Sequence, residues 1–262
     1  MSSNVLPYEL SGNRSSDQII VFLHGWPDTS AVWSKVIPSL ERNYCVLNIT
    51  YPNYPPKEKI PKGQDYEVLA DRAKETIDHM NETKRRVTLV SHDWGCWVGY
   101  YLDQRNPGYI SEMIALDVGA KFNFFLPSIL FYQMTLLIAF IIGRSIGRYL
   151  THFIMKKYFN YWPAWGEKMK SSENYDYRYL WKKIVMGGLS SDRGFLPNYR
   201  PSCPVTFVYG TVKPHQYFKQ EWLDWLTTNP KNEVHAFNAQ HWIQTEQPDF
   251  LISLIKRKLS SE

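Results

Sequence analysis

Residues 87–105 read VTLVSHDWGCWVGYYLDQR, which is a short apolar run, a turn and a longer segment with helical spacing. The first five residues predict a buried strand, and Trp94–Arg105 predicts a helix that follows almost at once. So tight a turn accepts only small residues two positions before and after its centre, here Ser91 and Gly95. The pattern predicts that the central Asp93 has a strained backbone and projects its carboxylate from the top of a sheet.

Asp93 has two interpretations at this stage. A carboxylate in this position can attack an electrophilic carbon and form an alkyl ester, and the helix N-terminus favours its anionic form. The alternative is that Asp93 only caps the helix that begins at Trp94. An ordinary serine esterase is disfavoured because Ser91 lies away from the apex of the turn.

Strands and helices alternate on both sides of this turn. The expected further strands are Gln18–Leu23, Tyr44–Thr50, Ile110–Val118, Val205–Tyr209 and Glu233–Phe237. The expected further helices are Thr29–Leu40, Asp65–Asn81, Gln220–Leu226 and Phe250–Leu259. Near-continuous apolar strands that alternate with helices are typical of a parallel sheet covered on both faces, so we expect an α/β fold.

The alternation stops in the middle of the chain, where residues 119–200 show helical patterns and no clear strand. We expect a core formed by residues 1–118 and 201–262, with 119–200 inserted as a helical cap above the carboxyl ends of the strands. The insert holds 12 Lys and Arg against 4 Asp and Glu, whereas the whole chain has a net charge of +5. The three cysteines are far apart, which supports neither a disulfide framework nor a zinc cluster, and we expect a cytoplasmic protein.

Two further motifs lie where an open α/β sheet keeps its chemistry. His24–Asp28 (HGWPD) follows the first strong strand, where the backbone N–H groups of Trp26 and Trp94 can converge on one oxygen and stabilise an oxyanion. His241 lies between the last expected strand and the last helix, where it can act as a general base on water. Taken alone, HGWPD could also be an ordinary turn after a strand.

These features, in this order, resemble the α/β-hydrolase superfamily, and within it the branch of epoxide hydrolases and haloalkane dehalogenases. HGWP at 24–27 and HDWG at 92–95 match recurring motifs of that branch, and the resemblance covers roughly residues 18–118 and 200–258. It implies an α/β-hydrolase fold, with a mostly parallel sheet flanked by helices and an inserted helical cap. It also implies a small apolar substrate, and neither a metal nor an organic cofactor.

Within this resemblance Asp93 is the nucleophile and His241 the base, but the third member of the triad departs from the pattern. Many members place an acid after the strand that follows the cap, and here no Asp or Glu occurs in the 10 residues after Val205–Gly210. We predict that Asp117, which ends the strand after the helix Trp94–Arg105, orients the histidine, as the corresponding acid does in some dehalogenases. Glu246 is a weaker alternative because it lies so near His241 in sequence. Asp117 could also simply cap a loop.

The insert begins with a long apolar segment, because residues 122–143 carry no charge. Three interpretations are open: an apolar cap that lines a substrate pocket, the same cap also dipping into a membrane surface, and a true membrane span. Basic and aromatic residues follow the run and suit an anionic lipid interface; they are Arg144, Arg148, Lys156, Lys157, Tyr161, Trp162, Trp165, Lys168 and Lys170. No nucleic-acid-binding motif accompanies them, so we expect no nucleic-acid partner.

The leaving group separates the two activities that the resemblance implies. An epoxide needs an acid for its oxygen, which cap tyrosines supply in epoxide hydrolases, and the candidates here are Tyr132, Tyr175, Tyr177 and Tyr179. A halide is held instead by N–H donors, for which Trp94 and Trp26 have suitable positions. We favour epoxide opening on an apolar substrate. The alternatives are haloalkane dehalogenation with the same residues and a catalytically idle scaffold that binds at a membrane.

Overall fold

The protein is built on one seven-stranded sheet, seen in a computed structural model that describes residues 4–55, 59–122, 124–187, 196–213 and 215–260. The strand order is β1-β3-β2-β4-β5-β6-β7, and all strands are parallel except β1, which pairs antiparallel with β3. The bounds are β1 Tyr8–Gly12, β2 Gln18–Leu23, β3 Cys45–Ile49, β4 Arg86–His92, β5 Glu112–Leu116, β6 Val205–Gly210 and β7 Glu233–Phe237. The expected mostly parallel α/β sheet is confirmed.

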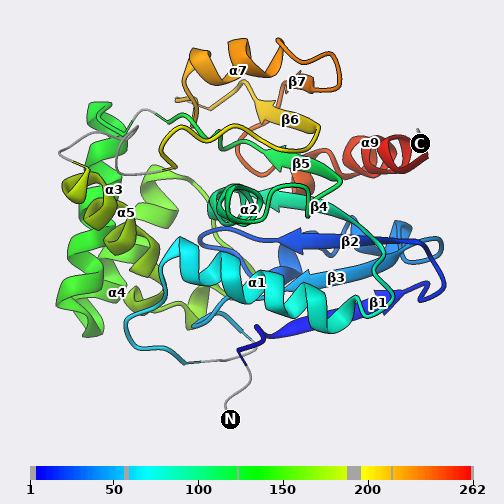
Figure 1. Ribbon diagram of the computed structural model, residues 1–262. Helices are drawn as coiled ribbons and strands as arrows, with labels where there is room; N and C mark the ends of the chain where they lie inside the picture. The colour runs from blue at the N-terminus through cyan, green and yellow to red at the C-terminus, as the bar shows by residue number, and fades with distance from the viewer. Residues whose placement is uncertain (1–3, 56–58, 123, 188–195, 214, 261–262) are drawn as a thin grey trace.

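The strands separate two hydrophobic layers, because successive side chains of a strand point to opposite faces. In β2, Ile19 and Val21 pack into the layer that contains the helices α1 (Tyr66–Met80) and α2 (Trp94–Arg105). Ile20 and Phe22 pack into the opposite layer. The remaining core helices are α7 Gln220–Leu226, α8 Ile243–Glu246 and α9 Pro248–Ser260, of which α8 and α9 belong to this second layer. Figure 1 shows α1 and α2 crossing in front of the sheet.

Two features of the core differ from the sequence-based prediction. Thr29–Leu40 does not form an α-helix but two short 3₁₀ turns, Ser30–Trp33 and Ile37–Ser39. Pro38 lies at the start of the second turn, and its missing N–H cannot extend a helix from the first. The edge strand β1 was not predicted, because its sequence YELSG is polar and mostly exposed and carries no apolar alternation.

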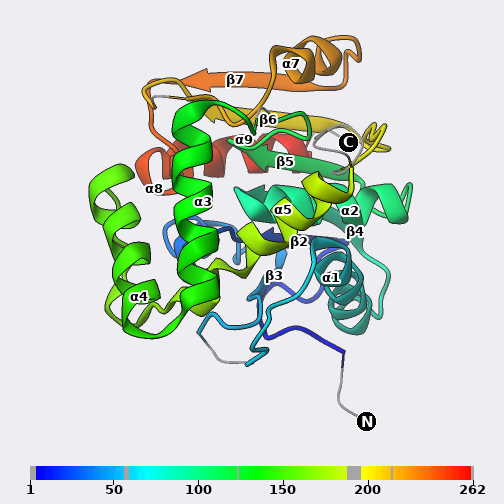
Figure 2. The same ribbon diagram turned by 90° about the vertical axis from the view of Figure 1, so that its left-hand side faces the viewer.

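In the described part of residues 119–200 the α-helices are α3 Pro127–Ile142, α4 Arg144–Phe153 and α5 Tyr175–Met186, joined by shorter turns. Asn123 and residues 188–195, which fall within the expected insert, lie outside the described residues. Figures 1 and 2 place these helices beside the ends of the sheet toward which the parallel strands point, where the loops of the core also gather. β6, which follows the insert in the sequence, pairs with β5, which precedes it. The sheet is therefore continuous across the insert.

Within the apolar run at 122–143, α3 spans Pro127–Ile142 and Gly143 forms its C-cap. Gly143 has φ 64°, a left-handed conformation that glycine adopts without steric strain and that ends α3 before α4 begins. Of the helices in the described part of the chain, none is both long and apolar enough to cross a membrane.

Candidate active site

Asp93 stands at the turn between β4 and α2, with φ 54° and ψ −124°. A non-glycine residue in this region is strained by roughly 1–3 kcal/mol, so the surrounding packing must hold it there. Two glycines make room for the turn: a Cβ on Gly25 would lie 2.4 Å from the Asp93 Cβ, and a Cβ on Gly95 would lie 2.4 Å from the Leu23 carbonyl oxygen. The strained turn predicted from the small residues around Asp93 is therefore present.

Asp93 occupies the N-cap position of α2, but its side chain makes no capping hydrogen bond to that helix. Its Oδ1 accepts a hydrogen bond of 2.9 Å from the backbone N–H of Trp26 in the HGWPD loop. The backbone N–H of Trp94 follows at the first turn of α2, and the rings of both tryptophans line the same cavity. A carboxylate oxygen held in this way is placed to carry negative charge in a later tetrahedral state.

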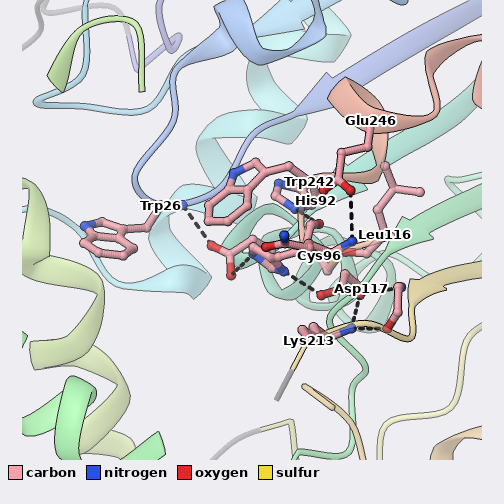
Figure 3. A network of polar contacts seen from close by, with 12 residues as sticks. Trp26, His92, Cys96, Leu116, Asp117, Lys213, Trp242 and Glu246 are labelled. Atoms are coloured by element: carbon pink, nitrogen blue, oxygen red, sulfur yellow. Dashed lines mark hydrogen bonds and ion pairs between the residues drawn. The ribbon is translucent and has the colours of Figure 1, made fainter. Parts of the chain in front are cut away.

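His241 bridges Asp93 and Asp117 from the loop between β7 and α8 (Figure 3). Its Nε2 lies 3.4 Å from Asp93 Oδ2, and its Nδ1 lies 2.5 Å from Asp117 Oδ2. Burial alone would lower the pKa of His241, but the hydrogen bonds to the two carboxylates raise it to about 9. The structure thus brings Asp93, His241 and Asp117 together into one chain of contacts.

Lys213 lies after β6, in the segment where the resemblance would place the acid of the triad, and it points at Asp117 (Figure 3). Its Nζ lies 2.5 Å from Asp117 Oδ1 and donates at 2.7 Å to the Gly210 carbonyl, while the Gly210 N–H donates at 3.0 Å to the same Asp117 oxygen. Burial alone would raise the pKa of Asp117, but Lys213 and His241 hold it below its ordinary value. Burial in turn lowers the pKa of Lys213. The segment after β6 therefore supplies a cation for the acid rather than the acid itself.

The alternative acid, Glu246, is the last residue of α8. Its Oε2 accepts a hydrogen bond of 3.0 Å from the backbone N–H of Gln240. This bond fixes the loop that carries His241 (Figure 3). Glu246 thus supports the loop, and of the two candidate acids it is Asp117 that contacts His241, at Nδ1.

A cavity opens beside Asp93 and His241 under the helices of the insert. Its lining is mostly aromatic: Trp26, Trp94, Trp97, Val118, Phe122, Tyr132, Gln133, Phe159, Tyr177, Tyr217 and Trp242. Of the four tyrosines proposed from the sequence, Tyr132 and Tyr177 belong to this lining. Tyr175 and Tyr179 do not, because Tyr175 is buried against Gly63 and the Tyr179 hydroxyl donates to the Gly63 carbonyl at 3.4 Å.

The two cavity tyrosines remain protonated at neutral pH. Burial raises the pKa of Tyr132 and of Tyr177, and the nearby Asp93 charge raises both further. The Tyr177 ring stands edge-on to the rings of Trp26 and Trp94, with centroids 5.4 and 5.1 Å away. Both phenols line the same cavity as Asp93, so either can serve as a proton donor there.

Sequence reasoning missed several polar groups around the cavity. Asp28 accepts hydrogen bonds from the Tyr161 hydroxyl at 2.6 Å and from the Trp242 indole N–H at 2.7 Å, and burial raises its pKa to about 6. Gln133 is 1% exposed, and its Oε1 has no hydrogen-bond partner among the described residues. Asp28 lies in the HGWPD motif, which was a usable signal. Gln133 and Tyr161 lie in the insert, where no motif marked them.

Metal ligands do not gather at this site. The described residues contain no group of three or more His, Cys, Asp and Glu side chains placed to hold a metal ion. Ser91, which a serine esterase would need, is fully buried, and its hydroxyl lies 3.6 Å from the Cys96 sulfur. The reactive groups that face the cavity are a carboxylate, an imidazole and phenols.

Residues 20–254 match the model of the alpha/beta hydrolase family. This chain belongs to the alpha/beta hydrolase family. The expected α/β-hydrolase fold is thereby confirmed. Solved structures agree, since this alpha/beta hydrolase superposes on a variant of an epoxide hydrolase from Bacillus megaterium with a TM-score of 0.73 at 21% identity, covering 97% of this chain and 96% of the other.

Curated relatives of this alpha/beta hydrolase include epoxide hydrolases. A soluble epoxide hydrolase of Corynebacterium sp. (strain C12) is 30% identical over 99 residues, which are 38% of this chain and 34% of that protein. Epoxide hydrolase 3 of Mus musculus is 26% identical over 119 residues, or 44% and 32% of the two chains. These matches span about a third of those relatives. The mesoderm-specific transcript homolog protein of Homo sapiens is 23% identical over 90% of this chain and 77% of its own length.

Proposed function

We propose that this alpha/beta hydrolase opens an epoxide of a small apolar substrate through an alkyl ester on Asp93. The observation that carries the proposal is that the two oxygens of the Asp93 carboxylate have different contacts. Oδ1 is held by the Trp26 N–H, whereas Oδ2 faces His241 and the cavity that Tyr132 and Tyr177 line. Such an oxygen is free to attack, and phenols stand beside it to protonate the oxygen that leaves carbon.

In the first step, Asp93 Oδ2 attacks an epoxide carbon and the carbon–oxygen bond of the ring breaks. A cavity tyrosine gives its proton to the departing oxygen, which becomes a hydroxyl, and the phenolate is reprotonated from solvent later. The product of this step is an ester between Asp93 and the hydroxyalkyl group. The protonated form of His241, favoured by its raised pKa, keeps Asp93 anionic before the attack.

In the second step, the ester is hydrolysed by water. Esterification removes the negative charge of Asp93, so one of the contacts that raise the pKa of His241 is lost, and the imidazolium releases its proton to solvent. His241 takes a proton from water, and the resulting hydroxide attacks the Asp93 carbonyl carbon. The Trp26 N–H stabilises the tetrahedral oxyanion. As the oxyanion collapses, the departing alkoxide takes the proton from His241 and leaves as the diol, and the Asp93 carboxyl then gives its proton to His241.

A halide-binding role is less well supported than epoxide opening. The indole N–H of Trp26, one of the two donors considered for a halide, donates to the Asn174 side chain at 3.1 Å. A halide would have to displace that buried hydrogen bond. Haloalkane substrates therefore stand as the alternative that the experiment must distinguish.

The test is to trap the ester in a His241→Gln variant and measure the intact mass after exposure to epoxides and to haloalkanes. Without the base the ester should form and persist. A mass increase equal to the whole epoxide, absent from the matched variant that also carries Asp93→Ala, supports the proposal. An increase equal to an alkyl group without halogen favours dehalogenation. A folded protein that forms no adduct with any compound, and a wild type without turnover, contradict both and favour the idle scaffold.

A further inference from the structure

The outward face of α4 is unusual for a surface helix, because it is apolar. Ile146, Tyr149 and Phe153 recur at helical spacing and are 63%, 69% and 40% exposed. The face turned toward the protein holds the small residues Gly147 and Thr151. A soluble surface helix normally has the opposite arrangement, with its apolar side chains inward.

This orientation of α4 is fixed by close packing against its neighbours. A Cβ on Gly147 would lie 2.2 Å from the Ala139 carbonyl oxygen of α3, so only glycine allows the two helices to approach so closely. The Thr151 hydroxyl accepts a hydrogen bond of 2.7 Å from Asn174. The apolar side chains therefore cannot turn inward by rotation of α4 without breaking both contacts.

The end of α3 extends the same apolar surface. Ile138, Ile141 and Ile142 are 47%, 71% and 48% exposed. Figure 2 shows α3 and α4 side by side, with α4 the outermost helix at this edge of the molecule. Together these six residues form what we call the apolar ridge: Ile138, Ile141, Ile142, Ile146, Tyr149 and Phe153. Contiguous exposed apolar side chains of this kind mark a surface that meets another apolar phase.

A basic groove adjoins the apolar ridge at the turn between α3 and α4. Its polar lining comes from Arg144, Arg148 and Lys170 with neighbouring serines, and its described lining contains no acidic residue. Two acidic residues lie beside the groove: Arg148 donates to the Glu167 backbone carbonyl, and the Lys170 backbone N–H donates to Glu173 Oε2 at 2.6 Å. Basic side chains that border exposed apolar ones complement a surface with an apolar interior and anionic headgroups.

We propose that the apolar ridge and the basic groove dock this protein on a membrane surface that contains anionic phospholipids. The ridge enters the headgroup region, and the groove holds lipid phosphates. A second copy of this chain fits less well, because a two-fold contact through the same surface would place the basic grooves of both copies together. The proposal does not depend on the reaction at Asp93, since vesicle binding is measured without turnover.

The docking surface and the cavity lie on the same helix, so docking would bring the cavity close to the membrane. α3 carries Tyr132 and Gln133 on the side that lines the cavity and Ile138 and Ile142 on exposed positions of the same helix. A protein docked through α3 and α4 would hold its cavity close to the bilayer, where apolar substrates concentrate. The docked surface and the substrate cavity therefore share one helix.

The experiment is co-sedimentation of the full chain with phosphatidylcholine vesicles, with and without phosphatidylserine. We expect binding to the anionic vesicles that weakens as salt is added. Arg144→Gln with Arg148→Gln should weaken it by about 10- to 30-fold, since each charge near an anionic surface contributes about 1 kcal/mol. Ile146→Ser with Tyr149→Ser should also release the protein, and both side chains are exposed enough to leave folding intact.

The matched control is Lys84→Gln with Lys231→Gln, which removes two exposed charges before β4 and β7, at the opposite ends of the strands. This variant should bind as the wild type does. The proposal is overturned if the wild type binds neither vesicle, if the control weakens binding as much as the arginine pair does, or if the ridge substitutions abolish a dimer in sedimentation while vesicle binding is unchanged.

Discussion

At the residue scale, the main departure from the arrangement that the resemblance implies lies after β6. Lys213 occupies this segment and contacts Asp117, and no acid is present there. No Asp or Glu occurs in the 10 residues after β6. Asp117 could be predicted as the replacement because it directly follows β5, the strand that comes after α2. The contact between Lys213 and Asp117 could not be predicted. It depends on how far the β6 loop folds back over the sheet, and the sequence of that loop carries no signal for this path.

Lys213→Met should slow the hydrolysis of the ester by at least about tenfold and lower the free energy of unfolding by roughly 2 kcal/mol. The substitution leaves one oxygen of a buried carboxylate without its cation, although His241 still contacts the other oxygen. Single-turnover kinetics separate the two steps, and chemical denaturation gives the stability. Lys213→Arg should recover part of both losses. Loss of stability with unchanged ester hydrolysis would show that Lys213 has only a structural role.

At the element scale, β2 to β7 and most helices of the core could be predicted, whereas the contacts that attach the insert to the core could not. Buried parallel strands have nearly continuous apolar sequences, so β2 to β7 could be located from sequence alone. The insert is held by scattered polar contacts, such as Tyr161 with Asp28 and Trp26 with Asn174. These pairs join residues more than a hundred positions apart, and no local periodicity predicts them.

Tyr161→Phe should loosen the insert from the core. The phenol donates to Asp28, and its loss leaves a buried carboxylate with one fewer donor, which should lower the free energy of unfolding by about 1–2 kcal/mol. The pKa of Asp28, already raised to about 6 by burial, should rise further. Thermal unfolding and titration followed by NMR measure the two effects. Tyr149→Phe, at an exposed position, is the control that should change neither; equal effects in both variants would refute the role of the hydrogen bond.

At the scale of the whole molecule, the pairing of His241 with two carboxylates makes stability depend on pH. The folded pKa of about 9 exceeds the ordinary value of 6.5, so the folded state binds the proton more tightly than the unfolded state. The resulting stabilisation is complete below pH 6.5 and is lost as the pH rises through 9. Denaturation curves across this range should show the decline, and His241→Gln should flatten it. A decline of the same size in the variant would assign it to other groups.

The continuity of the sheet across the insert has a consequence for how the chain folds. β5 and β6 are neighbours in the sheet, yet Leu116 and Val205 are separated by the whole insert, and the Trp242 indole reaches back to Asp28. During synthesis Asp93, Trp26 and the apolar helices of the insert are made before β6, which pairs with β5, and before His241. Until then β5 is an open edge beside exposed apolar surface, a state prone to aggregation.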